Sequence, residues 1–308
     1  MIERFAIIDR SSWLAMRSQD LTASDIGAVI GVDPYRSALR VYAEKAGEIG
    51  AEGETNIMRR GRWLEAATLE ALREELPGWR IERAGVYLRD PDVRLGGTPD
   101  ALAEDPEHPE RLLNVQMKVV SRPAYERDWA DGPPLGYQLQ TLAEGFLLDA
   151  DRSLLAALVI DTYSADVFVH EVPRHAAAEQ KIREIAAEFW QNIAAGRRPV
   201  PDYGKDADTI AAMFPRQEPG KVLDLTGDNR LIEILPQREF LKDRIDGDRK
   251  QLEALDAEVK YKLGDAETAE LPGWRLTFRE EHRKEYTVAA SSRRVLRVKQ
   301  IEQKDRAA

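Results

Sequence analysis

The middle of the chain changes from helical to strand-like patterning and back, and this order limits the possible folds. Leu112–Val120 is an apolar run with the alternation of a strand, and Leu135–Leu148 follows Pro133-Pro134 as a helix. Other segments fit the same reading: helices at 22–30, 39–46, 56–76 and 175–196, and strands at 79–87, 93–98, 153–162 and 166–172. A mixed central sheet flanked by helices, of the α/β or α+β class, is therefore predicted.

The composition changes after Pro201. Residues 202–229 are polar and rich in Gly and Asp, whereas apolar positions between Leu241 and Leu263 recur at helical spacing. Pro236 should start or kink that helix. We therefore predict one domain at 1–205 and a C-terminal accessory region at 206–308. That region should contain a helical arm at 237–263, a basic β-hairpin or tail at 264–308, and a short strand at 295–298.

Composition excludes several classes of protein. The 308 residues are 43% hydrophobic, which is enough for a sizeable core, and 32% charged. The chain has no cysteine, so disulfides and thiolate metal sites are excluded and a cytoplasmic location is expected. No apolar run reaches about 18 residues, and the first residues lack the profile of a signal peptide, so no membrane span or export is expected.

The charge distribution is uneven. The net charge of −10 argues against DNA binding, but residues 275–299 hold eight Lys or Arg against three Glu, which gives +5. Arg293 and Arg294 in this segment are candidate DNA contacts, because clustered cations favour phosphate. A solvated, charged tail with no binding role is the alternative interpretation.

Four residues in chain order suggest chemistry. Glu65 lies on the long helix, Asp100 follows a strand, and Gln116 and Lys118 lie on the next strand. Alternation puts Gln116 and Lys118 on the same face of that strand. This face should border a cleft, because a buried lysine without a partner is costly.

Such a set of residues suits phosphodiester hydrolysis. Oxygen ligands bind Mg²⁺, the ion activates water and neutralises phosphate charge, and a nearby lysine orients the water. Each of these residues alone is weak evidence for a hydrolytic site. A Pro-Asp pair is usually a turn, a glutamate on a charged helix is usually solvated, and a strand lysine often extends its amine to solvent at a sheet edge.

The ordered motifs of residues 8–200 together resemble the YqaJ-type viral recombinases, relatives of lambda exonuclease in the PD-(D/E)XK nuclease superfamily. The motifs are Arg17-x6-Ser24, Gly61-x-x-x-Glu65, Thr98-Pro-Asp100, Gln116-Met-Lys118 and Tyr137-Gln-Leu-Gln140. The pattern from Gly264-Asp through Gly273-Trp to the segment Ser292–Lys299 also resembles the tail of longer members. The resemblance implies a PD-(D/E)XK restriction-endonuclease-like core.

The resemblance also implies catalytic roles. Asp100, residue 116 and the backbone carbonyl of Met117 would bind Mg²⁺ or Mn²⁺, and Glu65 would hold a second ion, through water. Lys118 would position the attacking water. Gln138 would orient the site or the scissile phosphate.

The remaining implied roles concern DNA and partners. Arg17 and Ser24 would receive the 5′ phosphate of the shortened strand, since an arginine fork and a hydroxyl suit anions. Ser24 could equally be a plain helix cap. Gln140 is a further candidate DNA contact. The family implies a 5′→3′ exonuclease on linear duplex DNA, a homo-oligomer such as a trimer, a single-strand annealing recombinase as partner, and a phage or prophage origin in a bacterial host.

Gln116 departs from the family pattern, which has Glu at this position. A neutral amide oxygen is a weaker ligand for a hard cation than a carboxylate. The residue could be an engineered substitution that traps uncut DNA, a natural variant that still works, or the mark of an inactive homologue that binds DNA ends. The competing functions are therefore an exonuclease, a non-catalytic end-binding module, an endonuclease of the same superfamily, and a structural protein that assembles through its helical arm.

Overall fold

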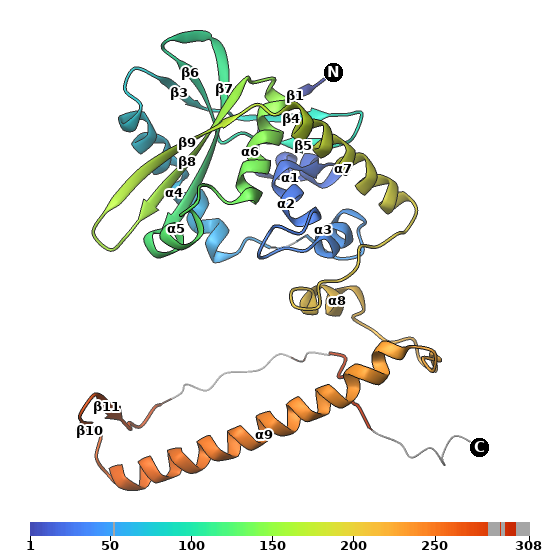
Figure 1. Ribbon diagram of the computed structural model, residues 1–308, viewed down its shortest axis with the longest axis vertical. Coiled ribbons are helices and arrows are strands. Elements are labelled where there is room, and N and C mark those ends of the chain that lie inside the picture. Colours follow the sequence, from blue (N-terminus) through green and yellow to red (C-terminus); the bar gives the residue numbers. More distant parts are fainter. Residues whose placement is uncertain (52, 283–289, 291–292, 300–308) are drawn as a thin grey trace. The chain divides into compact units, whose positions relative to one another are not determined.

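The computed structural model describes residues 1–51, 53–282, 290 and 293–299 (Figure 1). The chain divides into two compact units, Met1–Pro215 and Arg216–Ala308. The sequence placed this boundary between residues 205 and 206. Residues 206–215 join the first unit because the Ser37 hydroxyl, at the start of helix α3 (Ala38–Lys45), donates a hydrogen bond to the buried Asp206 carboxylate. Helix α8 (Ala207–Met213) follows directly.

After a short strand at Glu3–Ala6, the first unit continues with helices, as the sequence predicts. Helix α1 (Arg10–Gln19) is capped by Asp9, and helix α4 (Asn56–Glu75) by Thr55. The helix expected at 22–30 is shorter than predicted. A 3₁₀ turn at Ala23–Asp25 precedes the brief helix α2 (Ile26–Val29). The Asp25 carboxylate accepts hydrogen bonds from both the backbone amide and the hydroxyl of Thr22, which fixes this turn.

Two of the catalytic candidates, Gln116 and Lys118, lie on a five-stranded mixed sheet with the order β3-β6-β7-β8-β9. Its strands are β3 (Arg80–Arg83), β6 (Ala101–Asp105), β7 (His108–Ser121), β8 (Arg152–Ile160) and β9 (Ala165–Pro173). Strands β7 and β8 are parallel and the other neighbours antiparallel. Helices α5 (Arg122–Asp128) and α6 (Leu135–Leu148) connect the parallel pair, so the predicted α/β class with a mixed sheet is confirmed.

A second sheet has the order β1-β4-β5-β2. Its strands are β1 (Glu3–Ala6), β4 (Val86–Asp90), β5 (Leu95–Gly97) and β2 (Leu21–Thr22). The single strand predicted at 79–87 is wrong. The chain breaks at Gly85, whose φ of 56° is left-handed, and its two halves join different sheets as β3 and β4.

The five-stranded sheet is covered on both faces. Leu72 of α4 packs with Val115 and Met117 of β7 on one face. On the other, the Asn114 side-chain amide donates a 3.1 Å hydrogen bond to the Thr141 carbonyl of α6. Figure 1 shows α6 running along the sheet. Alternate residues of β7 therefore face α4 and α6, which directs Gln116 and Lys118 toward α6.

Helix α7 (Ala176–Ala194) follows β9 and is close to its predicted range. Its residues Ile182, Ala186 and Phe189 share a buried cluster with Leu147 of α6 and Leu88 of β4. This cluster fixes α6 between the two sheets. Among the described residues, no helix has both the length and the apolar character needed to cross a membrane.

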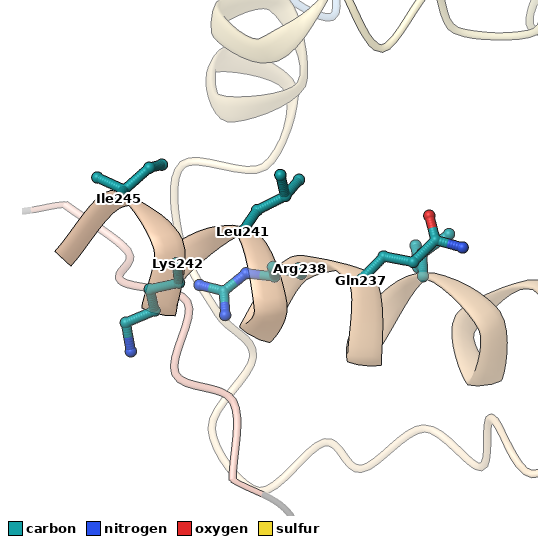
Figure 2. A pocket seen from close by; sticks show the side chains of 6 residues that line it. Gln237, Arg238, Leu241, Lys242 and Ile245 are labelled. Atoms are coloured by element: carbon teal, nitrogen blue, oxygen red, sulfur yellow. The ribbon is translucent and has the colours of Figure 1, made fainter. Parts of the chain in front are cut away.

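The second unit contains helix α9 (Asn229–Leu263), longer than the arm predicted at 237–263. Of the two roles predicted for Pro236, starting or kinking the helix, the first is wrong. The Asp228 carboxylate caps α9 earlier by accepting a hydrogen bond from the Leu231 amide, and Pro236 lies inside the helix. Figure 2 shows Leu241 and Ile245 projecting from one side of α9, where they are exposed.

The predicted hairpin of the second unit is confirmed as β10 (Thr268–Leu271) and β11 (Trp274–Thr277), with Gly273 at a φ of 82° in the turn. Within the described segment 293–299, no strand forms, so the strand expected at 295–298 is absent there.

We predict that Leu147→Ala lowers the free energy of unfolding by about 2 to 5 kcal/mol, because Leu147 is 1% exposed and the mutation leaves a cavity beneath α6. Urea denaturation measures the change. Leu135→Ala on the same helix is the control, since Leu135 is 53% exposed and should cost less than about 0.5 kcal/mol. Equal costs for the two variants would contradict the packing described for α6.

Candidate active site

Asp100 is tied to strand β7 through one carboxylate oxygen. It ends the turn between β5 and β6, and its Oδ2 accepts hydrogen bonds from the Met117 backbone amide at 2.7 Å and from Gln116 Nε2 at 2.5 Å. Both donors approach Oδ2. They lock the turn against the strand that carries Gln116 and Lys118, so the Thr98-Pro-Asp100 and Gln116-Met-Lys118 motifs meet in space.

The Asp100 carboxyl holds its proton more strongly than an ordinary aspartate. Burial raises its pKa to about 6, the positive charge of Lys118 and the Met117 amide oppose the rise, and Glu65 adds to it. The charges of Glu65 and Lys118 therefore both change the pKa of Asp100. The four residues that the sequence placed in one site are brought together.

Lys118 is held between two residues of α6. Its ammonium donates a 3.0 Å hydrogen bond to Gln140 Oε1 and lies 5.0 Å from the centre of the Tyr137 ring. The side chain is half-buried and satisfied by these contacts. This explains how a lysine is tolerated on a strand face that packs against a helix.

Glu65 enters from α4 on the other side of the sheet. Its Oε1 accepts hydrogen bonds from the Arg83 guanidinium of β3, one of them at 3.0 Å from Nε. Arg83 therefore orients Glu65 and balances its charge. A role for Glu65 in holding an ion stays a prediction.

Two glutamines of α6 differ in their placement. Gln138 donates from Nε2 to the Pro133 carbonyl at 2.6 Å, a local bond at the start of the helix. Gln140 instead contacts Lys118 directly. The structure thus brings Gln140 into the network around Lys118, and no hydrogen bond among the described residues joins Gln138 to it.

Glu144 belongs to this neighbourhood and was not singled out from the sequence. It is 1% exposed, and its Oε1 accepts a 3.0 Å hydrogen bond from Gln140 Nε2. Burial, followed by the negative charge of Asp100, raises its pKa to about 8. A usable signal was present, because a glutamate one helical turn after Gln140 interrupts an otherwise apolar stretch.

Arg17 and Ser24, the candidate phosphate ligands, are also adjacent. Arg17 Nη2 donates to Ser24 Oγ at 3.1 Å, and its guanidinium lies 4.7 Å from the centre of the Trp13 ring. The Trp13 indole donates a 3.0 Å hydrogen bond to Thr98 Oγ1. Trp13 therefore connects this pair to the turn that carries Asp100.

The donor set around Asp100 fits a hard divalent cation in type. Asp100 and Gln116 offer oxygen atoms, and Gln116 Oε1 is buried without a hydrogen-bond partner among the described residues. In the described part of the chain, no three Asp, Glu or His side chains gather at one point. Position 116 contributes a neutral amide to this neighbourhood and not a carboxylate.

Arg293 and Arg294 lie in the second unit and are exposed. Residues 283–289 and Ser292, which belong to the basic segment and the C-terminal motif, lie outside the described residues. The role of this segment in DNA binding stays a prediction.

Comparison with known proteins gives a similarity to one family over part of the chain. Residues 12–144 match the model of the YqaJ-like viral recombinase domain, and this range contains the Arg17, Glu65, Asp100, Gln116 and Lys118 motifs. The chain is also 24% identical over 276 residues to the uncharacterized protein YqaJ of Bacillus subtilis (strain 168), covering 84% of this chain and 80% of that protein.

The chain is also similar in structure to two solved exonucleases. LHK-Exo, an alkaline exonuclease from Laribacter hongkongensis, matches with 16% identity and a TM-score of 0.47, covering 61% of this chain and 94% of the other. A phage-related exonuclease from Haemophilus somnus 129PT matches with 15% identity and a TM-score of 0.42, covering 57% and 96%.

We predict that Asp100→Asn stabilises the metal-free protein at about pH 7.5 by about 1 to 3 kcal/mol. The folded-state pKa of Asp100 lies above its ordinary value of 3.8, so its stabilising contribution is present at low pH and is lost as the pH rises through about 6. The gain of the asparagine variant should therefore vanish below about pH 4. Urea denaturation with a chelator present measures this, and a variant less stable than the parent at every pH would contradict it.

Proposed function

We propose that this protein is a divalent-metal-dependent exonuclease that degrades one strand of linear double-stranded DNA in the 5′→3′ direction and leaves a 3′ single strand. The observation that carries the proposal is the joining of the Asp100 turn to Gln116 and Lys118 on β7, with the charge of Glu65 acting on the same carboxyl. Mg²⁺ or Mn²⁺, as one or two ions, is the proposed cofactor.

The proposed roles follow from atoms and charges. Asp100, Gln116 Oε1 and the Met117 carbonyl would hold the cation, which when bound supplies an activated water and balances phosphate charge. Lys118 orients that water, and its hydrogen bond to Gln140 limits where the ammonium lies. Glu65, oriented by Arg83, would contact a second ion through water. Gln138, whose Nε2 donates to the Pro133 carbonyl, would orient the site or the scissile phosphate.

Arg17 and Ser24 are proposed to hold the 5′ phosphate, with Gln140 and the Arg293–Arg294 pair as further DNA contacts. Arg17 is stacked on Trp13 and already points a guanidinium nitrogen at the Ser24 hydroxyl, so a positive fork and a hydroxyl face the same space. A bound phosphate would receive bonds from both. The 5′ specificity in the proposal depends on this pair.

Family resemblance supports the remaining parts of the proposal. We propose a homo-oligomer, with a trimer as the expected form, a single-strand annealing recombinase as partner, and action in the cytoplasm of a bacterial host that carries a phage or prophage. The exposed apolar side chains of α9, such as Leu241 and Ile245, offer a surface for such contacts.

A second candidate function is favoured by Gln116. A protein with a weak metal site but intact Arg17 and Ser24 would bind DNA ends without efficient cleavage. The two candidate functions differ in the rate of cleavage, because the same residues would serve both.

We predict that Gln116→Glu raises the Mg²⁺-dependent rate of digestion of an end-labelled linear duplex by about tenfold or more, because a carboxylate binds a hard cation more strongly than an amide. Gln191→Glu, an exposed change on α7, is the control for added surface charge. If the folded Gln116→Glu variant is no faster than its parent, residue 116 is not a metal ligand.

A covalently closed plasmid in the same assay separates exonuclease from endonuclease. The proposed activity leaves the closed circle intact and degrades the linearised form. Cutting of the closed circle would overturn the requirement for an end.

We predict that Arg17→Ala reduces by about tenfold the rate on duplexes with a 5′ phosphate, because a charge-assisted bidentate contact is lost, and leaves the slower rate on 5′-hydroxyl ends nearly unchanged. Arg10→Ala on the same helix is the control, since Arg10 is exposed and pairs with Glu54. Equal losses on both kinds of end would show that Arg17 does not read the phosphate.

A further inference from the structure

Glu144 is a second buried carboxylate beside the candidate active site, and the mechanism above gives it no role. Gln140 Nε2 donates to its Oε1, whereas its Oε2 is buried without a hydrogen-bond partner among the described residues. Its Cγ lies only 3.2 Å from where a Cβ on Gly97 would be. Gly97 is three residues before Asp100, so Glu144 faces the start of the Asp100 turn.

The charges of the site act on Glu144 directly. Burial is the main cause of its raised pKa, Asp100 raises that pKa further, and Lys118 and Arg17 lower it. Because the charges of Asp100, Lys118 and Arg17 change the pKa of this carboxyl, a divalent cation placed beside Asp100 would also act on it and favour its ionised form. The ionisation of Glu144 therefore depends on the charge of any ion that binds beside Asp100.

The site has too little negative charge for a divalent cation. Gln116 is neutral, and the charge of Glu65 is already balanced by Arg83. Asp100 is then the one carboxylate among the proposed ligands that forms no ion pair with a described residue. Taking a doubly charged ion out of water against a single carboxylate is unfavourable.

We propose that Glu144 supplies the negative charge that position 116 lacks and acts from α6 as a positioning residue for the cation and for Lys118. This inference rests on the proposed function. Through Oε1 it orients the Gln140 amide, whose oxygen then faces the Lys118 ammonium. Through its charge it balances the cation from outside the ligand set, which agrees with the absence of a three-acid cluster among the described residues.

Two backgrounds test the proposal. Binding of Mn²⁺ to the full-length protein without DNA is followed at about pH 8 by the electron paramagnetic resonance of the free ion. We expect Glu144→Gln to weaken binding by about tenfold when residue 116 is Gln and by less than about threefold in the Gln116→Glu protein, where a carboxylate is already present. Glu144→Asp, which keeps the charge, should retain most of the affinity lost in Glu144→Gln.

The control variant is Glu179→Gln on α7. Glu179 is also a buried glutamate, 6% exposed, but its ion pair is with Arg174. It should alter stability without altering Mn²⁺ affinity in either background. Thermal melting of every variant shows which of them are folded.

The outcomes separate the two proposals. A loss of affinity that is large with Gln116 and small with Glu at that position supports the role of Glu144. Equal losses in both backgrounds, or no loss in either, would overturn it while leaving the metal site in place. If neither the parent nor the Gln116→Glu protein binds Mn²⁺, the metal-dependent function and the inference about Glu144 both fall.

Discussion

The arrangement of the candidate active site depends on Oδ2 of Asp100. Two donors from β7, the Met117 amide and the Gln116 side chain, meet at this single oxygen and join the turn after β5 to the centre of the mixed sheet. Pairing of Ala101 with Val115 sets the register of the two segments, and this junction fixes the Asp100 side chain within it. Because a carboxylate accepts such bonds most strongly when ionised, the junction and the charge of the site are linked. Burial opposes that ionisation, which is why the pKa of Asp100 settles at about 6.

Helix α6 is the second structural requirement. It lies across the face of β7 that carries Gln116 and Lys118, and it approaches β5 so closely that Gly97 has no space for a side chain: a Cβ there would be 2.9 Å from Leu147. The apolar residues of α6 fix the helix in the core, and Gln140 and Glu144 are consequently held at the site. Packing of this helix thus determines where Lys118 can place its ammonium.

The sequence predicted the parts of the fold that have a strong local period. Strand alternation in Leu112–Val120 correctly put Gln116 and Lys118 on one face, and the apolar spacing of 135–148 correctly gave the helix that covers them. It did not predict the break at Gly85, because two strands on either side of a glycine look continuous when neither has yet been assigned to a sheet. The start of α9 was misplaced for a related reason: Pro236 is a strong local signal, but the cap at Asp228 outweighs it.

Within the site, ordered motifs were enough to name Asp100, Gln116 and Lys118, since their chemistry follows from residue type and spacing. The choice between Gln138 and Gln140, and the involvement of Glu144, depend on the rotation of α6 about its axis. That rotation is set by Leu147 and its tertiary neighbours. No pattern along the chain specifies it.

The hydrogen bond from Trp13 to Thr98 has a consequence for the position at which the proposed enzyme would cut DNA relative to its end. The Trp13 ring also contacts the Arg17 guanidinium, and Thr98 is two residues from Asp100. The proposed 5′-phosphate ligands and the Asp100 turn are therefore connected through Trp13. In the proposed function, the distance between the bound 5′ phosphate and the site of cleavage would therefore be set by contacts within the folded protein and not by the base sequence.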